Sequence, residues 1–544
     1  MKYLLIALVA ALLFIPFLGA VHLFDWDEIN FAEAAREMIV SHNYSQVQID
    51  FKPFWEKPPL FIWMQAGSML LFGVNEFAAR FPNAIIGILT LLSLYGIGKK
   101  LSDDKLGLWW ALVYAGSWLP HFYFKSGIID PAFNLFIFGA VYFAYRIAFS
   151  NQPMRMAIFS GTSLGLAVLT KGPVAILVAL LTLLIYWIWN KGKTAIRPAH
   201  LGLIALFASL TTLLWFGYEI ALHGWWFVNE FIIYQIRLLT TADAGHGGPF
   251  FYHWIVLLIG CFPASTFLFT AFEGRKKSIY QTPPAPEIKD FKVWMWVLFW
   301  VVLILFSLVK TKIVHYSSLC YFPLSFLAAY QINKLSRGRL RLRGWHIALL
   351  LVTGLLIGSA LVLLPVAGIY KHLLIPHIGD AFAVGNLQAD VSWAPGEMAY
   401  GIAYMILILV SAGLLLRRKI TGGLLCLFIS TILMIQVTVV HFVPKIERYS
   451  QGAAIDFFRS LQGKDVYVKA LDYHSYAQHF YTRELPPANP QYYQTDWLLN
   501  GAVDKPVYFI CRITDSAPYR QHPNLEVIGE KNGFVFLKRR TVQP

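Results

Sequence analysis

Two acidic residues, Asp27 and Glu28, open a predicted helix directly after the first apolar stretch of the sequence. Carboxylates beside so much lipid-soluble sequence are energetically expensive, so their presence calls for a specific role. A positioned carboxylate can take the proton from a hydroxyl group as that group attacks an electrophilic carbon. The pattern also fits a structural role, because Asp25 and Glu28 have the spacing of a capping box and acids suit a helix N-terminus.

A short proline-containing segment, Glu56-Lys57-Pro58-Pro59, follows in the same predicted loop. Pro58 restricts Lys57 to extended geometry, so the lysine cannot continue a helix. A lysine fixed at the boundary between water and lipid is suited to a phosphate, because it is a compact charge with three donors. A lysine that only reaches from the lipid to the interface would give the same pattern.

Two further charged residues lie at the outer ends of predicted spans. Asp130 precedes Pro131, so it either caps the helix that follows or lines a cavity. Lys171 has apolar residues on both sides, which favours a place in a cavity, either functional or as half of a structural ion pair.

Two further outer loops add Arg237 with His246, and His315 with Tyr316. An arginine can hold a phosphate through two donors, whereas a lone histidine is more often structural. Lysines beside His315 oppose the general orientation bias of the chain, which favours an anionic ligand. Because separate outer loops all supply groups suited to a phosphate or a proton, we expect them to meet in one outer cavity.

The composition predicts a polytopic membrane protein. Of the 544 residues 57% are hydrophobic and only 14% are charged, whereas about a quarter are charged in soluble proteins. The net charge of +15 does not indicate nucleic acid as a partner, because lysine and arginine gather in the short loops between apolar stretches. Basic residues that cluster in short loops indicate how a chain is oriented in the membrane.

About thirteen stretches approach the roughly 20 mostly apolar residues that a span needs. They are residues 3–22, 80–98, 106–121, 127–149, 156–170, 173–190, 199–222, 251–271, 293–309, 313–333, 345–366, 398–416 and 421–443. The apolar run 60–73 is short, and counting it would reverse every later loop, so we expect it to lie at the interface. Lys171-Gly172-Pro173 breaks one helix pair, as is tolerated where a pair lines a cavity.

The charge bias predicts an inner N-terminus and two domains. Residues 1–445 form a mainly α transmembrane domain, with outer juxtamembrane helices at about 27–75 and an outer loop at about 223–250. After residue 445 the composition changes, and short strands are expected at 465–469, 506–510 and 533–537, with a helix at 450–461. We therefore expect residues 446–544 to form a small α/β domain outside the membrane.

The pattern resembles a known family. Asp27-Glu28 with Phe31-Ala32-Glu33-Ala34-Ala35-Arg36-Glu37-Met38, followed by Glu56-Lys57-Pro58-Pro59-Leu60 and Trp63, is similar to the integral-membrane glycosyltransferases related to the aminoarabinose transferase of lipid A. These are cousins of the protein O-mannosyltransferases and share the GT-C architecture. The resemblance covers essentially the whole membrane region.

The resemblance implies thirteen spans, a bacterial inner-membrane location and inverting transfer of a sugar from undecaprenyl phosphate to a periplasmic-side acceptor such as lipid A. It implies no required cofactor, although a divalent metal at Glu56 is compatible with it. By this resemblance Asp27 is the catalytic base, Lys57, Arg237 and Tyr316 contact the donor phosphate, and Glu56 and Asp130 line the cavity. To these we add Glu28 as a second catalytic residue, Lys171 as a phosphate contact, and His246 and His315 as cavity-lining residues.

The sequence departs from the family pattern at Phe54, where a tyrosine is expected, and in residues 42–51. Both departures concern the acceptor more than the chemistry. Transfer to a protein or another glycan therefore remains an alternative. A secondary transporter or lipid flippase is a second alternative, although it would place its charges near mid-membrane in repeated broken helices.

Overall fold

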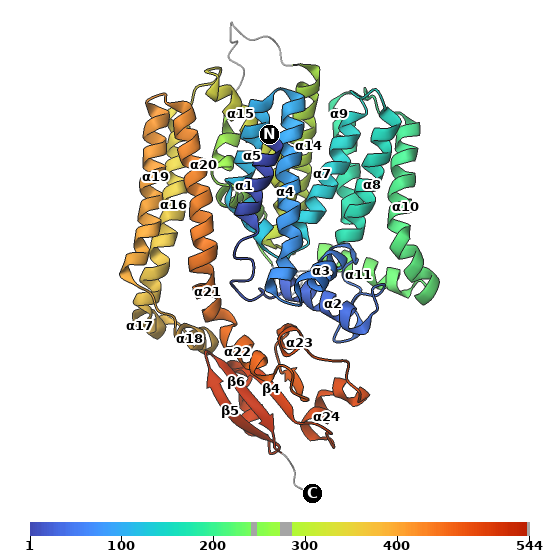
Figure 1. The fold of residues 1–544 in the computed structure, drawn as a ribbon, viewed down its shortest axis with the longest axis vertical. Coiled ribbons are helices and arrows are strands. Elements are labelled where there is room, and N and C mark those ends of the chain that lie inside the picture. Colours follow the sequence, from blue (N-terminus) through green and yellow to red (C-terminus); the bar gives the residue numbers. More distant parts are fainter. Residues whose placement is uncertain (241–246, 272–284, 541–544) are drawn as a thin grey trace.

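The computed structural model describes residues 1–240, 247–271 and 285–540. Most of its helices run side by side in one bundle, and a small β-sheet lies beyond one end of that bundle (Figure 1). The N-terminus lies toward the opposite end (Figure 1).

The first half of the bundle consists of α1 (Lys2–Phe14), α4 (Glu76–Leu101), α5 (Asp104–Ala115), α6 (Trp118–Phe122), α7 (Asp130–Arg146), α8 (Pro153–Lys171), α9 (Val174–Trp189) and α10 (Pro198–His223). At the end nearer the sheet lie α2 (Asp27–Ser41), the short hairpin β1 (Gln48–Ile49) and β2 (Lys52–Pro53), α3 (Leu60–Phe72) and α11 (Trp226–Thr240) (Figure 1).

The second half consists of α12 (Tyr252–Gly260), α13 (Ala264–Leu268), α14 (Pro286–Leu308), the 3-10 segment η4 (Val314–Cys320), α15 (Tyr321–Ser336), α16 (Gly344–Ile369), α17 (Lys371–Leu374), α18 (Ala381–Leu387), α19 (Met398–Leu416) and α20 (Ile420–Val437). The last of these continues through a π-helical turn (Thr438–Phe442) into α21 (Val443–Ser450).

Among the described residues, six helices are long and apolar enough to cross a membrane, and eight segments qualify if each of two bent pairs counts as one span. The chain is thus a polytopic membrane protein, but length and composition do not establish the predicted number of thirteen. One bent pair, at 107°, divides the stretch 251–271 that the sequence predicted as a single span. Pro263 lies at this break, where its missing N–H interrupts helical hydrogen bonding.

The predicted break at Lys171 is confirmed. Helix α8 ends at Lys171, and α9 begins at Val174. Gly172 has a φ of +111°, which a residue with a side chain rarely adopts. A Cβ atom there would also lie 2.6 Å from the ring of Phe231. The glycine therefore lets the chain turn while α11 packs closely against it.

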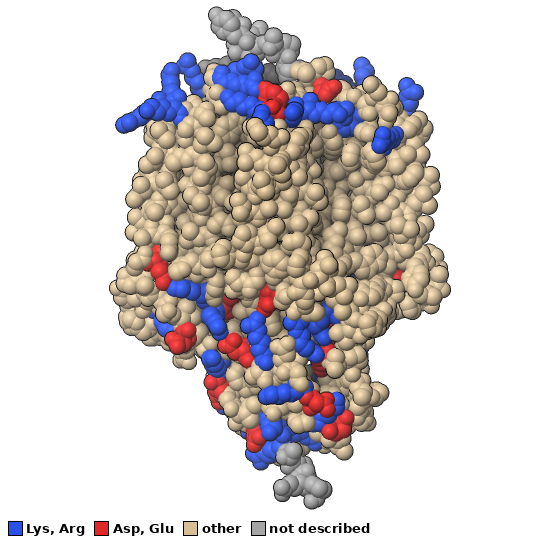
Figure 2. Space-filling model, viewed as in Figure 1, with Lys and Arg blue, Asp and Glu red and all other residues tan. Residues whose placement is uncertain are grey.

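Lysine and arginine gather at the end of the bundle opposite the sheet, with an almost uncharged band below them (Figure 2). The exposed side chains of this band are largely leucine, isoleucine and aromatic residues on the bundle helices. Both signs of charge are mixed at the other end (Figure 2). This is the surface expected of a protein whose middle faces lipid.

The C-terminal part contains α22 (Gly452–Leu461), β3 (Tyr467–Ala470), α23 (Ala477–Thr482), α24 (Thr495–Asn500), β4 (Val507–Arg512), α25 (Ala517–Arg520), β5 (Leu525–Lys531) and β6 (Phe534–Arg539). The four strands form one sheet in the order β3-β4-β6-β5, with β3 parallel to β4 and the other pairs antiparallel.

Side chains alternate between the two faces of this sheet, as strand geometry requires. Val507, Phe509 and Val535 belong to a small core on one face, whereas Ile510 and Phe536 join the large core that continues into the bundle. The sheet is therefore packed onto the membrane region and not merely tethered to it.

Two elements were not predicted from the sequence. The stretch expected as an outer loop at 223–250 contains helix α11, whose Phe231 packs beside the break at Gly172. Strand β5 was not predicted, because only one of its seven residues, Leu525, is buried and the apolar alternation is weak. The other three predicted strands and the helix at 450–461 are present within a few residues.

Candidate active site

A cavity of about 770 Å³ lies at the end of the bundle that faces the sheet. Its lining includes most of the predicted site residues: Asp27, Glu28, Glu56, Lys57, Asp130, Lys171, His315 and Tyr316. The expectation that separate outer loops meet in one cavity is therefore met for these residues. In particular, Asp27 and Lys57 share the cavity.

Asp130 and Lys171 form a buried ion pair inside this cavity. The Lys171 Nζ lies 2.5 Å from Asp130 Oδ1, and the side chains are 15% and 2% exposed. Asp130 is the first residue of α7, and its neighbour Ile129 is the N-cap, so the carboxylate does not cap the helix. The Lys171 Nζ also lies 5.3 Å from the centre of the Tyr316 ring. The break after α8 thus brings one cation to an otherwise apolar wall.

Of the two carboxylates at the start of α2, Asp27 is more accessible than Glu28. Its side chain is 30% exposed, and its Oδ2 lies 3.4 Å from His315 Nε2. The same histidine nitrogen lies 3.9 Å from Asp130 Oδ2. The alternative capping role is not seen, since Trp26 is the N-cap of α2 and makes no side-chain cap. Asp27 therefore presents a carboxylate to the cavity, with an imidazole beside it.

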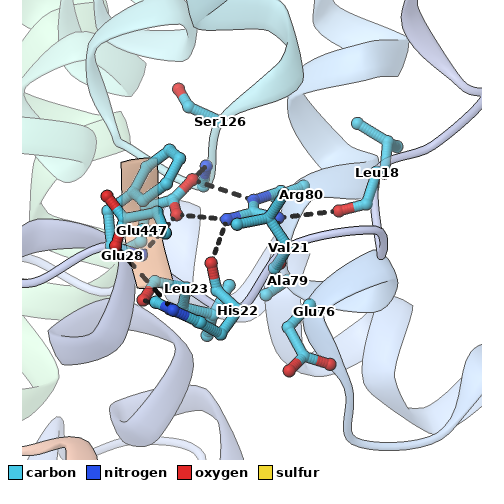
Figure 3. Close-up of polar contacts among 12 residues, drawn as sticks. Leu18, Val21, His22, Leu23, Glu28, Glu76, Ala79, Arg80, Ser126 and Glu447 are labelled. Carbon is cyan, nitrogen blue, oxygen red and sulfur yellow. Dashed lines mark hydrogen bonds and ion pairs between the residues drawn. The ribbon is translucent and has the colours of Figure 1, made fainter. Parts of the chain in front are cut away.

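Glu28 is held very differently from Asp27, although the two are adjacent. Arg80 donates to both carboxylate oxygens of Glu28, at 3.1 and 2.7 Å, and the backbone N–H groups of Phe24 and Gly127 donate to them as well. Glu28 is 2% exposed. Figure 3 shows this network, with Arg80 also donating to the carbonyls of Leu18, Val21 and His22. The lone pairs of Glu28 are thus already engaged.

The loop before Asp130 is fixed by the same network. Glu28 binds the N–H of Gly127, and Asn83 donates to the carbonyls of Ser126 and Ile128 at 2.7 and 2.6 Å. Gln65 on α3 donates to the Gly127 carbonyl at 3.3 Å. Buried polar side chains are stable when they are hydrogen-bonded in this way. They tie the start of α2, which carries Asp27, to the loop that carries Asp130.

Two other cations near the site cap helices. Lys125 Nζ donates to the carbonyls of Leu13 and Pro16 at the end of α1. Lys312 Nζ donates to the carbonyls of Phe306, Ser307 and Val309 at the end of α14. A cation at a helix C-terminus compensates unsatisfied carbonyls and the negative end of the helix dipole. The lysines that interrupt the charge bias at this face are therefore partly structural.

The remaining two predicted residues are not placed in the cavity. Arg237 is an exposed residue of α11 and is not among the described residues that line the cavity. His246 lies outside the described residues. A metal at Glu56 also stays a prediction, because Glu56 belongs to no group of three close ligand side chains among the described residues.

The C-terminal part contributes residues that sequence analysis did not assign to the site. His474 and Tyr476 line the cavity, and the His474 ring lies 5.0 Å from the Trp26 ring. Burial lowers the pKa of His474, while the negative charge of Glu56 opposes that shift. The only sequence signal is the polar and aromatic run Asp472-Tyr473-His474-Ser475-Tyr476 in an otherwise ordinary loop. The loop between β3 and α23 thus forms one wall of the cavity.

The chain is similar to known proteins, both to a protein family and to individual transferases. The family described as dolichyl-phosphate-mannose-protein mannosyltransferase matches residues 56–215. An undecaprenyl phosphate-alpha-4-amino-4-deoxy-L-arabinose arabinosyl transferase of Wigglesworthia glossinidia brevipalpis is 26% identical over 323 residues, which are 57% of this chain and 54% of the relative. The transferase of the same name from Pectobacterium carotovorum is 25% identical over 444 residues, 76% of each chain.

The matches to the most similar of these relatives span little more than half of their length. Among solved structures, ArnT from Cupriavidus metallidurans bound to undecaprenyl phosphate is similar with a TM-score of 0.78 at 18% identity. This match covers 99% of the present chain and 98% of that protein. The likeness thus includes the C-terminal sheet, which the sequence resemblance had left aside. The chain thus shares the fold of this ArnT structure, and over part of its length it is similar in sequence to the arabinosyl transferases named above.

Proposed function

We propose that this protein is a membrane glycosyltransferase that moves a sugar from an undecaprenyl-phosphate donor to an acceptor such as lipid A. The observation that carries the proposal is the single cavity that joins an accessible carboxylate, Asp27, to the lysines Lys57 and Lys171. The similarity to transferases named for undecaprenyl phosphate and aminoarabinose supports this choice of donor.

In the proposed reaction, an acceptor hydroxyl oxygen attacks the anomeric carbon of the sugar. The bond between that carbon and the phosphate oxygen breaks, and undecaprenyl phosphate leaves with the electron pair. The hydroxyl proton passes to Asp27, whose carboxylate is 30% exposed and thus able to meet an entering acceptor. A single displacement of this kind inverts the configuration of the carbon.

The lysines supply the positive charge that a leaving phosphate needs. Lys57 lies on the cavity wall in the segment made rigid by Pro58 and Pro59. Lys171 is already paired with Asp130, so it contributes a positioned but partly neutralised charge. His315 and Tyr316 complete this side of the cavity. Arg237 stays in the proposal as a contact of the donor phosphate, and His246 stays in it as a residue that lines the cavity. A divalent metal held by Glu56 is compatible with the proposal.

For Glu28 we propose a positioning role in place of the catalytic one expected from the sequence. Its carboxylate receives four hydrogen bonds and is almost fully buried. The four donors already occupy both carboxylate oxygens, so they are not open to an acceptor hydroxyl. It instead fixes the adjacent Asp27 relative to the loop of Asp130.

We further propose that the protein lies in a bacterial inner membrane, with thirteen crossings and the cavity and C-terminal sheet on the periplasmic side. An odd number of crossings is supported by the opposite positions of the N-terminus and the sheet (Figure 1). The cation-rich end in Figure 2 would then face the cytoplasm.

The decisive experiment combines purified protein in detergent with undecaprenyl-phosphate aminoarabinose and lipid A, and detects the product by mass spectrometry. Donors with other sugars, and glycan or protein acceptors, are tested in parallel. Asp27→Asn should reduce transfer by about 100-fold or more, the usual contribution of a general base, while binding of undecaprenyl phosphate is retained.

Asp465→Asn is the matched control, since this carboxylate is 81% exposed on the C-terminal part. It should transfer at the wild-type rate. Full activity of Asp27→Asn would remove the proposed base. Absence of product with every donor and acceptor pair would contradict the transferase function itself.

A further inference from the structure

Outside the cavity, three potential metal ligands converge between the outer hairpin and the C-terminal part. Asp50, His479 and Glu484 each offer one ligand atom, and these atoms lie within 4.8 Å of one another. Asp50 lies in the turn between β1 and β2, His479 lies on α23, and Glu484 follows that helix. The His479 Nδ1 and Glu484 Oε2 are in direct contact.

The backbone around the cluster is fixed by hydrogen bonds. Glu37 accepts hydrogen bonds from the backbone N–H groups of Asp50 and Phe51, at 2.7 and 2.9 Å. Tyr493 donates its hydroxyl to the Asp50 carbonyl at 3.0 Å. Within the cluster, the Glu484 N–H donates to the His479 carbonyl at 3.2 Å. These contacts hold the hairpin turn in place and keep Glu484 next to His479.

The surrounding charges leave the cluster with an excess of carboxylates. Asp50 and Glu484 meet at His479, while the nearby Arg36 is engaged by Glu33 at 2.6 and 2.8 Å. Lys469 lies 3.5 Å from Asp50 Oδ2 only. Asp50 Oδ1 is buried and has no hydrogen-bond partner among the described residues. Burying a carboxylate oxygen without a partner is unfavourable, so a positive ligand would stabilise this arrangement.

A second unpaired atom points to the same place. Gln478 is 4% exposed, its amide nitrogen lies 3.2 Å from His479 Nε2, and its Oε1 has no partner among the described residues. Amide oxygen and nitrogen positions are interchangeable assignments. If Nδ1 of His479 binds a cation, Nε2 carries the proton and can donate to the turned Gln478 amide oxygen. Metal-bound histidines usually have such a second partner.

We propose that Asp50, His479 and Glu484 form a site for a divalent transition-metal ion of the Zn²⁺ class. One imidazole and two carboxylates are a suitable donor set, with a fourth position left for water. The ion would join the β1–β2 hairpin, which leads into Glu56 and Lys57, to α23, which follows His474 and Tyr476. It would thereby hold two walls of the cavity together.

In the absence of a metal, protonated His479 would supply the positive charge between the two carboxylates. Burial lowers the pKa of His479, but Glu484 and Asp50 raise it overall. Protons and metal then compete for the same imidazole, so metal affinity should fall as the pH is lowered. The alternative to the proposal is therefore a simple ion pair of protonated His479 with the two carboxylates.

The test uses the full-length, tag-free protein, dialysed against chelator and then reloaded with ZnCl₂. Bound zinc is measured by mass spectrometry of the metal. Wild-type protein should bind about one Zn²⁺ per chain at this site, and its melting temperature should rise on loading. His479→Lys keeps a cation for the two carboxylates but removes the imidazole, so it should lose this one equivalent and the thermal shift.

Two controls separate this site from others. Glu526→Gln, an exposed carboxylate on β5, should bind zinc like the wild type. Glu56→Gln should also retain this equivalent, which distinguishes it from a metal at the cavity and makes the result independent of the transferase proposal. Equal zinc content and equal thermal shift in wild-type and His479→Lys proteins, or no zinc retained by the wild type, would overturn the proposal.

Discussion

The lysines near the cavity have different roles although they look alike in the sequence. Lys125 and Lys312 bind backbone carbonyls at helix ends, and Lys171 is paired with Asp130. Lys57 lines the cavity on a proline-restrained segment. Removal of each lysine should therefore have a different effect.

Lys57→Ala should weaken binding of undecaprenyl phosphate by roughly 10- to 100-fold, the equivalent of one charged hydrogen bond. Lys171→Met should destabilise the fold, because it leaves the Asp130 carboxylate buried without a partner. Titration with undecaprenyl phosphate and thermal melts in detergent measure the two effects.

The control for Lys171 is the double variant Asp130→Asn/Lys171→Met, which removes both charges and should recover much of the lost stability. Unchanged affinity in Lys57→Ala would exclude Lys57 as a phosphate contact. A Lys171→Met protein as stable as the wild type would show that the pair does not contribute to folding.

Asp25 gives a pH-dependent prediction outside the proposed chemistry. It lies before α2, where burial raises the pKa of its carboxyl group and Oδ1 has no partner among the described residues. The folded state then binds the proton more tightly than the unfolded state. The ionised Asp25 carboxylate therefore lowers the stability of the fold once the pH rises above about 4, the ordinary pKa of an aspartate. Asp25→Asn should therefore raise the melting temperature at pH 7.

The gain from Asp25→Asn should shrink as the pH is lowered through the ordinary pKa of an aspartate and should be lost by about pH 2.5, where the wild-type carboxyl is protonated in both states. Asp465→Asn, at an exposed position, should show no such pH-dependent gain. A lower melting temperature of Asp25→Asn at pH 7 would mean that the ionised carboxylate is stabilised by a partner.

At the scale of elements, Arg80 joins three parts of the chain that meet only in the folded protein. From α4 it reaches the carbonyls of the segment between α1 and α2 and both oxygens of Glu28 (Figure 3). Glu28 then holds the Gly127 N–H before α7. The relative positions of Asp27 and Asp130 therefore depend on the buried ion pair of Arg80 and Glu28. That ion pair in turn depends on the position of α4, which carries Arg80.

Arg80→Gln should destabilise the protein by about 3–5 kcal/mol, the usual loss when one partner of a buried ion pair is removed. The remaining folded enzyme should transfer sugar slowly, because Asp27 is misplaced, while its affinity for undecaprenyl phosphate changes little. Thermal melts, turnover and titration of undecaprenyl phosphate measure these quantities separately.

The double variant Glu28→Gln/Arg80→Gln should be less destabilised than the sum of its single variants, because neither charge is left alone. Additive losses would show that the two residues act independently. Normal turnover of folded Arg80→Gln would remove its positioning role.

At the scale of the whole molecule, the charge distribution predicts orientation. Cations lie at the end opposite the C-terminal sheet, and an uncharged band separates them from mixed charges (Figure 2). A cysteine placed at exposed Lys464 should react with a membrane-impermeant maleimide in intact spheroplasts. A cysteine at exposed Arg341 should react only after permeabilisation.

Three of the four native cysteines, Cys261, Cys320 and Cys511, are buried, and Cys426 on α20 is partly buried, so its labelling sets the background. The parent protein without the new cysteine is the control. Labelling of the Arg341 variant in intact cells, with protection of the Lys464 variant, would reverse the proposed orientation.

The sequence by itself determined the class of protein and much of the site. Apolar stretches separated by basic loops specify a polytopic membrane protein, because burial in lipid and the positive-inside bias act on local composition. Glycine and proline at 172 and 173 specified the helix break for the same local reason. Charged residues in apolar surroundings, such as Lys171 and Asp130, could be singled out because their burial is costly without a partner.

Tertiary structure decided which charges meet. Asp27 and Glu28 are neighbours in the same pattern, yet only Glu28 encounters Arg80, which comes from a different helix. His474 and Tyr476 reach the cavity because one face of the C-terminal sheet packs onto the bundle core. Such long-range contacts arise from packing of whole elements, and no local preference of these residues encodes their partners.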